Sequence, residues 1–293
     1  MAEQTSRPTA RLELRDTAIE NRHDMSSSDA AGPANNRGSD AFFIRDGDAY
    51  LPQPECRGPW DAGSLHGRVV AGLLAHAIED QHGSAEMMPA RLTVDMYRLP
   101  DFSPMTIATR VIRAGRRIKV VDAEVFSAGK SVGRASCQLL LRTANAPGNI
   151  WRTPNWDAAM PETLAPPDYV GFGATMWDMR PITPFMAAMP NKRTWMREIR
   201  DLVSGIPITP WMRAALAADF ASPFANSGDE GLGYINTDLS LYLHRQPRGE
   251  WIGFETVNHQ ATDGVAIGEC FVYDKEGLIG STTVCALAQA KRV

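Results

Sequence analysis

The sequence lacks the cysteine pairs and histidine clusters that mark disulfide-rich and metal-binding proteins. Its cysteines include no closely spaced CxxC pair, and no group of histidines stands at metal-ligand spacing. We therefore expect free, mostly buried thiols in a reducing compartment, with no metal site and no cofactor. The cysteines are Cys56, Cys137, Cys270 and Cys285.

A surplus of positive charge is also missing. The chain carries 30 Lys and Arg against 34 Asp and Glu, a net charge of −4. Neutralising nucleic-acid phosphates requires a basic surplus, so a nucleic-acid partner is not expected. No apolar run approaches the length of about 20 residues that a membrane helix needs, and the N-terminus lacks the apolar core of a secretory signal. We predict a cytoplasmic protein with no membrane partner.

What the sequence does contain is ample material for packed cores. Its 293 residues, 44% of them hydrophobic and 22% charged, have ordinary globular composition. This length allows two fused domains of about 125 residues each. Residues 1–40 are rich in small, polar and charged side chains and have almost no aromatic ones, so we predict a disordered tail.

The first half of the remaining chain predicts one helix followed by strands. Apolar residues recur at helical spacing over 65–78, with Ser64 as the expected N-cap. Strand-like stretches follow at 90–99, 105–113, 116–126 and, after a turn at 127–130, at 132–142. Residues 42–51 are expected to supply an earlier strand.

The second half repeats this order. A helix is predicted over 210–220, with Thr209 as N-cap and Pro210 at its first position. A strand at 234–245 and hairpin turns at 262–264 and 274–277 follow. Part of the Pro- and Trp-rich segment 143–190, together with 193–203, should supply this copy's first strand. Two copies of one order of elements indicate a duplication.

A helix followed by an antiparallel meander is the element order of the hotdog fold. We therefore predict an α+β class, a tandem (double) hotdog in which each copy has a central helix wrapped by an antiparallel sheet. Pairing two copies edge to edge removes the exposed edge that a single copy would leave. The expected parts are a tail at 1–40, an N-terminal hotdog at 41–145, a linker at 146–175 and a C-terminal hotdog at 176–293.

Two segments carry a family resemblance. Residues 237–247, TDLSLYLHRQP, followed by GEWIGFE, resemble the core signature of bacterial acyl-CoA thioesterase II, and 65–78 resemble the helix that opens that family's first hotdog. The segment GPWDAGSLHGR is similar to an actinobacterial-type thioesterase-like subgroup. The resemblance covers about residues 42–290. It implies hydrolysis of an acyl-CoA substrate to a free acid and CoA by a homo-oligomer.

The resemblance also implies a catalytic set. In that family an Asp, a Ser or Thr and a Gln position a water against the thioester carbonyl. Asp238 matches the Asp. The hydroxyl position falls at 257–259, where no Ser or Thr stands; Asn258, His259 and the nearby Thr262 are candidates to replace the missing hydroxyl and Gln. The Gln position falls near Val284, with no Gln within three residues.

The predicted start of the first helix offers a second group of candidates. Free N–H groups and the helix dipole there favour negative charge, so Gly67 is expected to help form an oxyanion hole. His66 precedes it and is a candidate acid or base, as the His-Gly pair of single-hotdog thioesterases suggests. The structural alternatives are a glycine required for close packing and a capping histidine.

Coenzyme A carries phosphate groups that arginine side chains bind well. The basic residues available for its nucleotide end are Arg98, Arg113, Arg116, Arg117, His244, Arg245 and Arg248. Two other functions stay open: a non-catalytic acyl-thioester-binding hotdog protein, and a hotdog hydratase or dehydratase. The sequence contains no stretch like the Asp-x-Asn-Pro-x-His of the latter enzymes.

Overall fold

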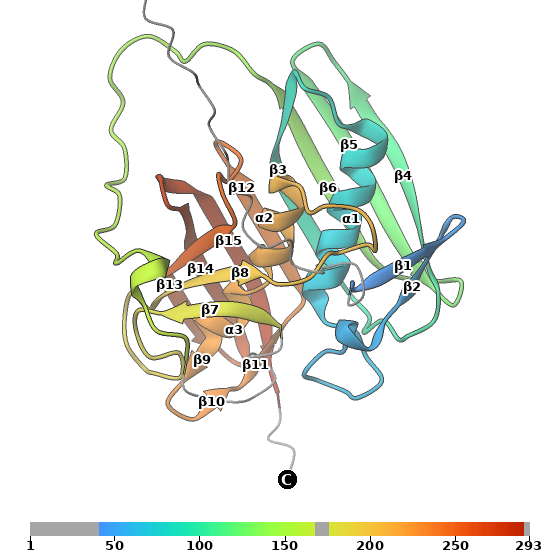
Figure 1. The fold of residues 1–293 in the computed structure, drawn as a ribbon. Helices are drawn as coiled ribbons and strands as arrows, with labels where there is room; N and C mark the ends of the chain where they lie inside the picture. The colour runs from blue at the N-terminus through green and yellow to red at the C-terminus, as the bar shows by residue number, and fades with distance from the viewer. Residues whose placement is uncertain (1–40, 168–175, 290–293) are drawn as a thin grey trace, which may run out of the picture. The chain divides into compact units, whose positions relative to one another are not determined.

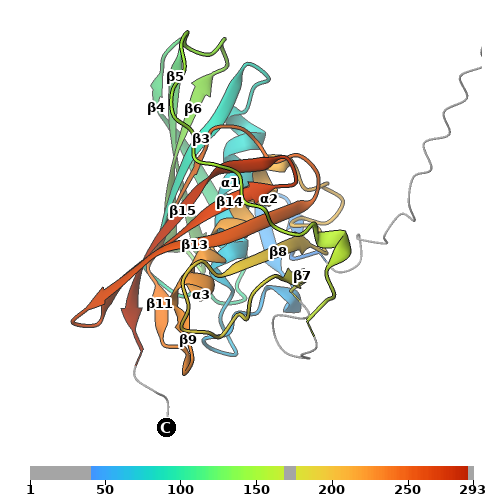
Figure 2. The same ribbon diagram turned by 90° about the vertical axis from the view of Figure 1, so that its left-hand side faces the viewer.

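One long antiparallel sheet, with helices against one of its faces, dominates the structure. The computed structural model describes residues 41–167 and 176–289. Figure 1 shows α1 (Gly67–His82) and α2 (Pro210–Ala218) side by side in front of the strands. Turned by 90° in Figure 2, both helices again lie on the same side of the sheet. No helix in these two ranges is long and apolar enough to cross a bilayer.

The first half of the sheet surrounds α1. Its strands cross the sheet in the order β1-β2-β4-β5-β6-β3. Every residue of α1 from Arg68 to Ile78 is buried, because the helix packs against the sheet and against α2. The elements are β1 (Phe43–Asp46), β2 (Ala49–Pro52), the 3₁₀ turn η1 (Pro54–Cys56), α1, β3 (Met87–Met96), β4 (Met105–Ala114), β5 (Ile118–Ser127) and β6 (Lys130–Leu141).

The second half follows the same plan. Its strands cross the sheet in the order β7-β8-β13-β14-β15-β12, which matches the first half strand for strand. Strand β11 also pairs with β15, and β9 and β10 form a separate short hairpin. The elements are η2 (Pro161–Thr163), β7 (Trp177–Pro181), β8 (Arg193–Glu198), α2, α3 (Ala221–Asn226), β9 (Ser227–Gly228), β10 (Gly231–Leu232), β11 (Tyr234–Asn236), β12 (Asp238–Leu243), β13 (Trp251–Thr262), β14 (Val265–Asp274) and β15 (Gly277–Ala288).

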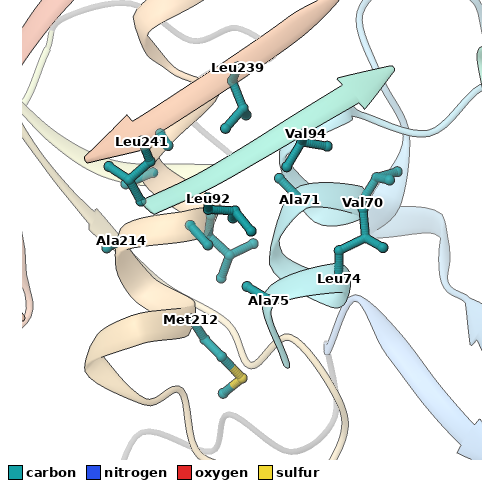
Figure 3. Packing of buried hydrophobic residues seen from close by; sticks show 14 of the residues in the cluster. Val70, Ala71, Leu74, Ala75, Leu92, Val94, Met212, Ala214, Leu239 and Leu241 are labelled. Atoms are coloured by element: carbon teal, nitrogen blue, oxygen red, sulfur yellow. The ribbon is translucent and has the colours of Figure 1, made fainter. Parts of the chain in front are cut away.

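Strands β3 and β12 join the two halves. They pair antiparallel, with Asp238 opposite Asp95. Because side chains alternate along a strand, every second residue of each strand points toward the helices. Figure 3 shows these inward residues packed against α1 and α2; they are Leu92, Val94, Leu239 and Leu241, all fully buried.

The two helices pack closely and run in opposite directions. A Cβ on Gly72 of α1 would lie only 2.6 Å from Leu216 Cδ2 of α2, so this approach requires glycine. Thr209, which caps the start of α2, donates its hydroxyl to Glu79 Oε2 in the last turn of α1 at 2.5 Å. The start of one helix therefore lies beside the end of the other.

A fully buried ion pair links α1 to the second half of the sheet. Arg68 donates to Glu198 Oε1 on β8 at 2.6 Å, with side-chain exposures of 0% and 2%. The guanidinium also donates to Met176 O at 3.2 Å. It lies over the rings of Trp177 and Phe42, 4.4 and 4.7 Å from their centroids. This pair fixes the start of α1 against β7 and β8.

The segment 151–167 covers part of the sheet face that is turned away from the helices. Trp156 stacks on Tyr273, with ring centroids 4.2 Å apart, and contacts Trp195 at 5.2 Å. Asn155 Oδ1 accepts a hydrogen bond from Leu278 N at 3.2 Å. These contacts bury a small second cluster of aromatic rings on the second half only.

Several local expectations are confirmed. Thr209 caps α2 and Pro210 is its first residue. The turn before β14 places Asp263 and Gly264 at φ values of 51° and 80°, as a tight hairpin requires.

Two local expectations are wrong. His66, not Ser64, is the N-cap of α1, because Ser64 turns its hydroxyl to Asp61 O. The strand expected over 234–245 is interrupted at Thr237 and ends at Leu243. The predicted tail at 1–40 and residues 168–175 of the predicted linker lie outside the described residues.

Breaking the buried pair should destabilise the fold strongly. Glu198→Ala leaves the Arg68 guanidinium buried without its carboxylate, and we expect a loss of about 3–5 kcal/mol in unfolding free energy. The measurement is urea unfolding followed by circular dichroism. The matched control is Glu276→Ala, which breaks the Arg248–Glu276 surface pair, with exposures of 67% and 52%. It should cost at most about 1 kcal/mol. Equal losses in both variants would contradict the proposed importance of the pair.

Candidate active site

A large, mainly apolar pocket opens where the start of α1 meets the end of α2. Its volume is about 780 Å³. Apolar side chains such as Trp177, Phe185 and Phe220 form most of the wall. Polar side chains from both halves of the chain also line it: His66, Asp219, Ser222, Asn236 and Thr237. A pocket of this kind suits a ligand that has an apolar body and one reactive polar group.

His66 is held in place at the start of α1. As N-cap, its Nδ1 lies 3.3 Å from Arg68 N, and it also lies 3.3 Å from Asp219 Oδ2. Its ring meets the Trp177 ring edge to face, with centroids 5.9 Å apart. The two neighbours of Nδ1 favour opposite tautomers, because one is a donor and the other an acceptor. When Nδ1 carries the proton and donates it to Asp219, Nε2 carries the lone pair and can accept a proton.

Asp219 follows the last turn of α2 and is a buried carboxylate. Its Oδ1 accepts a hydrogen bond from Asn236 Nδ2 at 2.8 Å. Burial raises the pKa of the Asp219 carboxyl, but His66, the Asn236 amide and the nearby charge of Arg68 outweigh it and hold that pKa below its usual value. The carboxyl is therefore ionised at neutral pH and takes up a proton only as the pH falls through this lowered pKa.

Gly67 leaves room for that carboxylate. A Cβ here would lie 2.8 Å from Met96 Sδ and 3.2 and 3.4 Å from the two carboxylate oxygens of Asp219. Its N–H is the first of α1, and within the part of the chain that the structure describes it donates no hydrogen bond. A free N–H at a helix start attracts negative charge. The site thus combines a histidine–carboxylate pair with a donor suited to an oxyanion.

Protein-family models match both halves of the chain. Residues 56–141 match the acyl-CoA thioesterase N-terminal domain, and residues 153–285 match the acyl-CoA thioesterase C-terminal domain. The chain belongs to the acyl-CoA thioesterase family. This membership confirms the resemblance found in the sequence and the function expected from it, the hydrolysis of an acyl-CoA thioester.

Solved structures show the fold of this thioesterase. A putative thioesterase II from Thermobifida fusca YX is 17% identical with a TM-score of 0.69, over 88% of this chain and 99% of that one. A hot dog fold protein of unknown function from Alicyclobacillus acidocaldarius is 15% identical with a TM-score of 0.68, over 85% and 96%. The tesB protein of Mycobacterium avium subs paratuberculosis is 14% identical with a TM-score of 0.63, over 85% and 96%. No curated protein matches the chain. These likenesses establish a hotdog-type fold.

The structure brings together two of the six residues expected in the thioesterase site. His66 and Gly67 lie side by side at the pocket, next to Asp219. Asp238 does not line the pocket: it alternates with inward-pointing Leu239, so its side chain lies on the opposite face of the sheet. There its Oδ1 accepts from Cys285 N at 2.6 Å. Burial and the nearby Asp95 raise the pKa of Asp238, partly offset by that hydrogen bond.

The other three expected residues lie along the second half of β13 and are not part of the pocket lining. His259 packs edge-on against the Tyr234 ring, with centroids 6.2 Å apart. Burial and the nearby charge of Lys192 lower the pKa of His259. Thr262 is exposed beside the hairpin turn, and Asn258 is half-buried. The expected grouping of these side chains with Asp238 and His66 is not found.

Three residues of the proposed machinery were not found in the sequence: Asp219, Ser222 and Asn236. A usable signal existed for Asp219. Every residue of α2 from Trp211 to Ala218 is buried, so the helix is packed on all sides and a carboxylate at its end cannot reach bulk water easily. An acidic residue directly after a helix that is apolar apart from Arg213 therefore indicates a buried, partnered carboxylate. No comparable signal exists for Asn236.

A methyl group on Gly67 should disturb the site without unfolding the protein. Gly67→Ala crowds Met96 Sδ and the Asp219 carboxylate, and a shift of a few tenths of an ångström to about 1 Å should lower kcat by about 10- to 100-fold. The measurement is release of CoA thiol from an acyl-CoA, with the melting temperature as a check on folding. The control is Gly63→Ala, whose Cβ would meet only Asp61 Oδ1 at 3.4 Å. A Gly67→Ala enzyme with wild-type kcat would contradict this geometry.

Proposed function

We propose that the protein hydrolyses acyl-CoA thioesters with a His66–Asp219 pair, at one end of the α1–α2 contact in a tandem hotdog. The observation that carries this proposal is the buried Asp219 carboxyl beside His66 and the free N–H of Gly67, all at one apolar pocket. The apolar walls would hold the acyl chain, and the thioester would lie beside His66 and the Gly67 N–H.

In this mechanism His66 is the general base and Asp219 positions it. A water adds to the thioester carbonyl carbon while its proton passes to His66 Nε2, and the Nδ1–H of the resulting imidazolium donates to Asp219. The carbonyl electron pair moves to oxygen, next to the Gly67 N–H and the positive end of α1. When the C=O bond re-forms, the C–S bond breaks and the CoA thiolate takes the proton from His66. The products are the free acid and CoA.

Asn236 and Ser222 complete the proposed machinery. Asn236 donates to Asp219 Oδ1 and, at 3.2 Å, to Asp238 O, so it ties the carboxylate to the strand that joins the two halves. Ser222, buried in the pocket wall, is the available hydroxyl for orienting the water. The carboxylate role expected for Asp238 thus moves to Asp219, and we assign no chemical step to Asn258, His259 or Thr262.

The repeated order of strands supports a tandem hotdog. Each half has one central helix on the same face of the sheet and the same succession of strands across it. We retain 41–145 and 176–293 as the two hotdogs and 146–175 as the linker between them. Three buried thiols and one exposed thiol, none in a disulfide among the described residues, support a cytoplasmic location.

Replacing the carboxylate should nearly abolish turnover. Asp219→Asn keeps the shape of the side chain but loses the negative charge that holds the His66 tautomer and stabilises its imidazolium. We expect kcat to fall by about 10²–10⁴ with little change in melting temperature. The matched control is Asp238→Asn, which should retain wild-type turnover. If only Asp238→Asn lost activity, the catalytic carboxylate would be Asp238 and not Asp219.

We also propose a homo-oligomer. Large apolar side chains are exposed on β4 and near the starts of β5 and β14, and a second copy would cover them. They include Val111, Ile112, Ile118, Val265 and Ile267. Light scattering at micromolar concentration should give a mass that is a multiple of 32.1 kDa. A mass of 32.1 kDa at that concentration would exclude a stable oligomer.

A further inference from the structure

Three consecutive residues after β3 form one side of the pocket mouth. Tyr97 and Leu99 are large apolar side chains, yet they are 49% and 53% exposed. Arg98 lies between them, and all three line the pocket. The Tyr97 hydroxyl is hydrogen-bonded to Ser131 Oγ, which fixes the ring while leaving it open to solvent. We call Tyr97, Arg98 and Leu99 the rim.

Arg98 has a charge that the rest of the described chain does not neutralise. Its guanidinium is exposed and forms no ion pair or ring contact within residues 41–167 and 176–289. Other candidate cations do have partners: Arg245 donates to Asp274 Oδ1 at 2.7 Å, and Arg248 pairs with Glu276. His244 Nε2 is hydrogen-bonded to Leu278 O at 2.9 Å.

The remaining candidate cations lie far from the pocket. Arg113, Arg116 and Arg117 are at the β4–β5 turn. Strand β4 starts just beyond the rim and runs for 10 residues, which at about 3.3 Å per residue places its far end about 30 Å away. Of the seven basic residues that could meet coenzyme A, only Arg98 lines the pocket.

The rim is close to the reacting centre. Met96 directly precedes it, and Met96 Sδ lies 2.8 Å from where a Cβ on Gly67 would be. Two residues of chain span at most about 7 Å, so the Cα of Arg98 lies within that distance of the Cα of Met96. If the thioester of an acyl-CoA is held at Gly67, the pantetheine arm would therefore extend out of the pocket past the rim.

We propose that the rim is the subsite for the nucleotide end of coenzyme A, with Arg98 binding its phosphates and Tyr97 offering a ring to the adenine. This inference rests on the proposed function, because it takes an acyl-CoA as the bound substrate. A guanidinium binds phosphate oxygens through paired N–H donors, and an exposed aromatic ring stacks on a base. The chain has a net charge of −4, so the positive charge of Arg98 at the pocket mouth would attract the phosphates of CoA and orient the substrate.

The test measures binding without turnover. Calorimetric titration with free CoA and with pantetheine, which lacks the nucleotide and its phosphates, compares the wild type with Arg98→Ala and Arg98→Gln. Both variants should bind CoA about 3- to 10-fold more weakly than the wild type, and pantetheine equally well. Added salt should weaken CoA binding by the wild type more than by the variants. The matched control Arg116→Ala removes the same charge at the far end of β4 and should bind CoA as the wild type does.

Three results of this binding experiment would contradict the proposed subsite. Wild-type CoA affinity in Arg98→Ala, an equal loss for CoA and pantetheine, or a wild type that does not bind CoA would each exclude it. Failure of the proposed function is a separate observation, the absence of thiol release from any acyl-CoA by the wild type. In kinetics, Arg98→Ala should raise KM for acyl-CoA with kcat unchanged, and should leave both constants for the acyl-pantetheine thioester as in the wild type.

Discussion

Helices α1 and α2 pack against each other in opposite directions on one face of a shared sheet, and the position of every functional side chain follows from this contact. Gly72 allows the close approach, since a larger side chain would collide with Leu216. Because the directions are opposite, the free N–H of Gly67 at the start of α1 lies next to Asp219, the residue that follows α2. Neither half contains His66, Gly67 and Asp219 by itself, so the site exists only when both halves are folded together.

The same contact places several charges in a region of low polarity. Arg68 and Glu198 are fully buried, and the buried Asp219 lines the pocket. Electrostatic effects are stronger there than in water, which is why the charge of Arg68 contributes to keeping Asp219 ionised. The ion pair therefore has two effects: it fixes α1 against β7 and β8, and it favours the charge state that the proposed chemistry requires.

Elements with a strong local signal were predictable from the sequence, and the relations between distant segments were not. Both helices and most strands follow from apolar periodicity, and the Thr209-Pro210 start of α2 follows from capping chemistry. His66 and Gly67 were found because they lie next to each other at a helix start. Asp238 was assigned from a strand motif, but the alternation along β12 turns it away from the pocket. Asp219 and His66 are 153 residues apart in sequence, and only the tertiary contact shows that they meet.

The contact between the helices has two ends, and only one of them lines the pocket. At the other end Thr209 is bonded directly to Glu79, and Trp211 Nε1 donates to Ala75 O at 3.2 Å. In a symmetric pair of separate subunits these ends would be identical, and each substitution would appear at both. Joining the copies in one chain removes that restriction, so one end can accumulate changes that favour rigidity while the other retains reactivity. Substitutions at Glu79 and Thr209 can therefore increase the stability of the fold without changing catalytic activity.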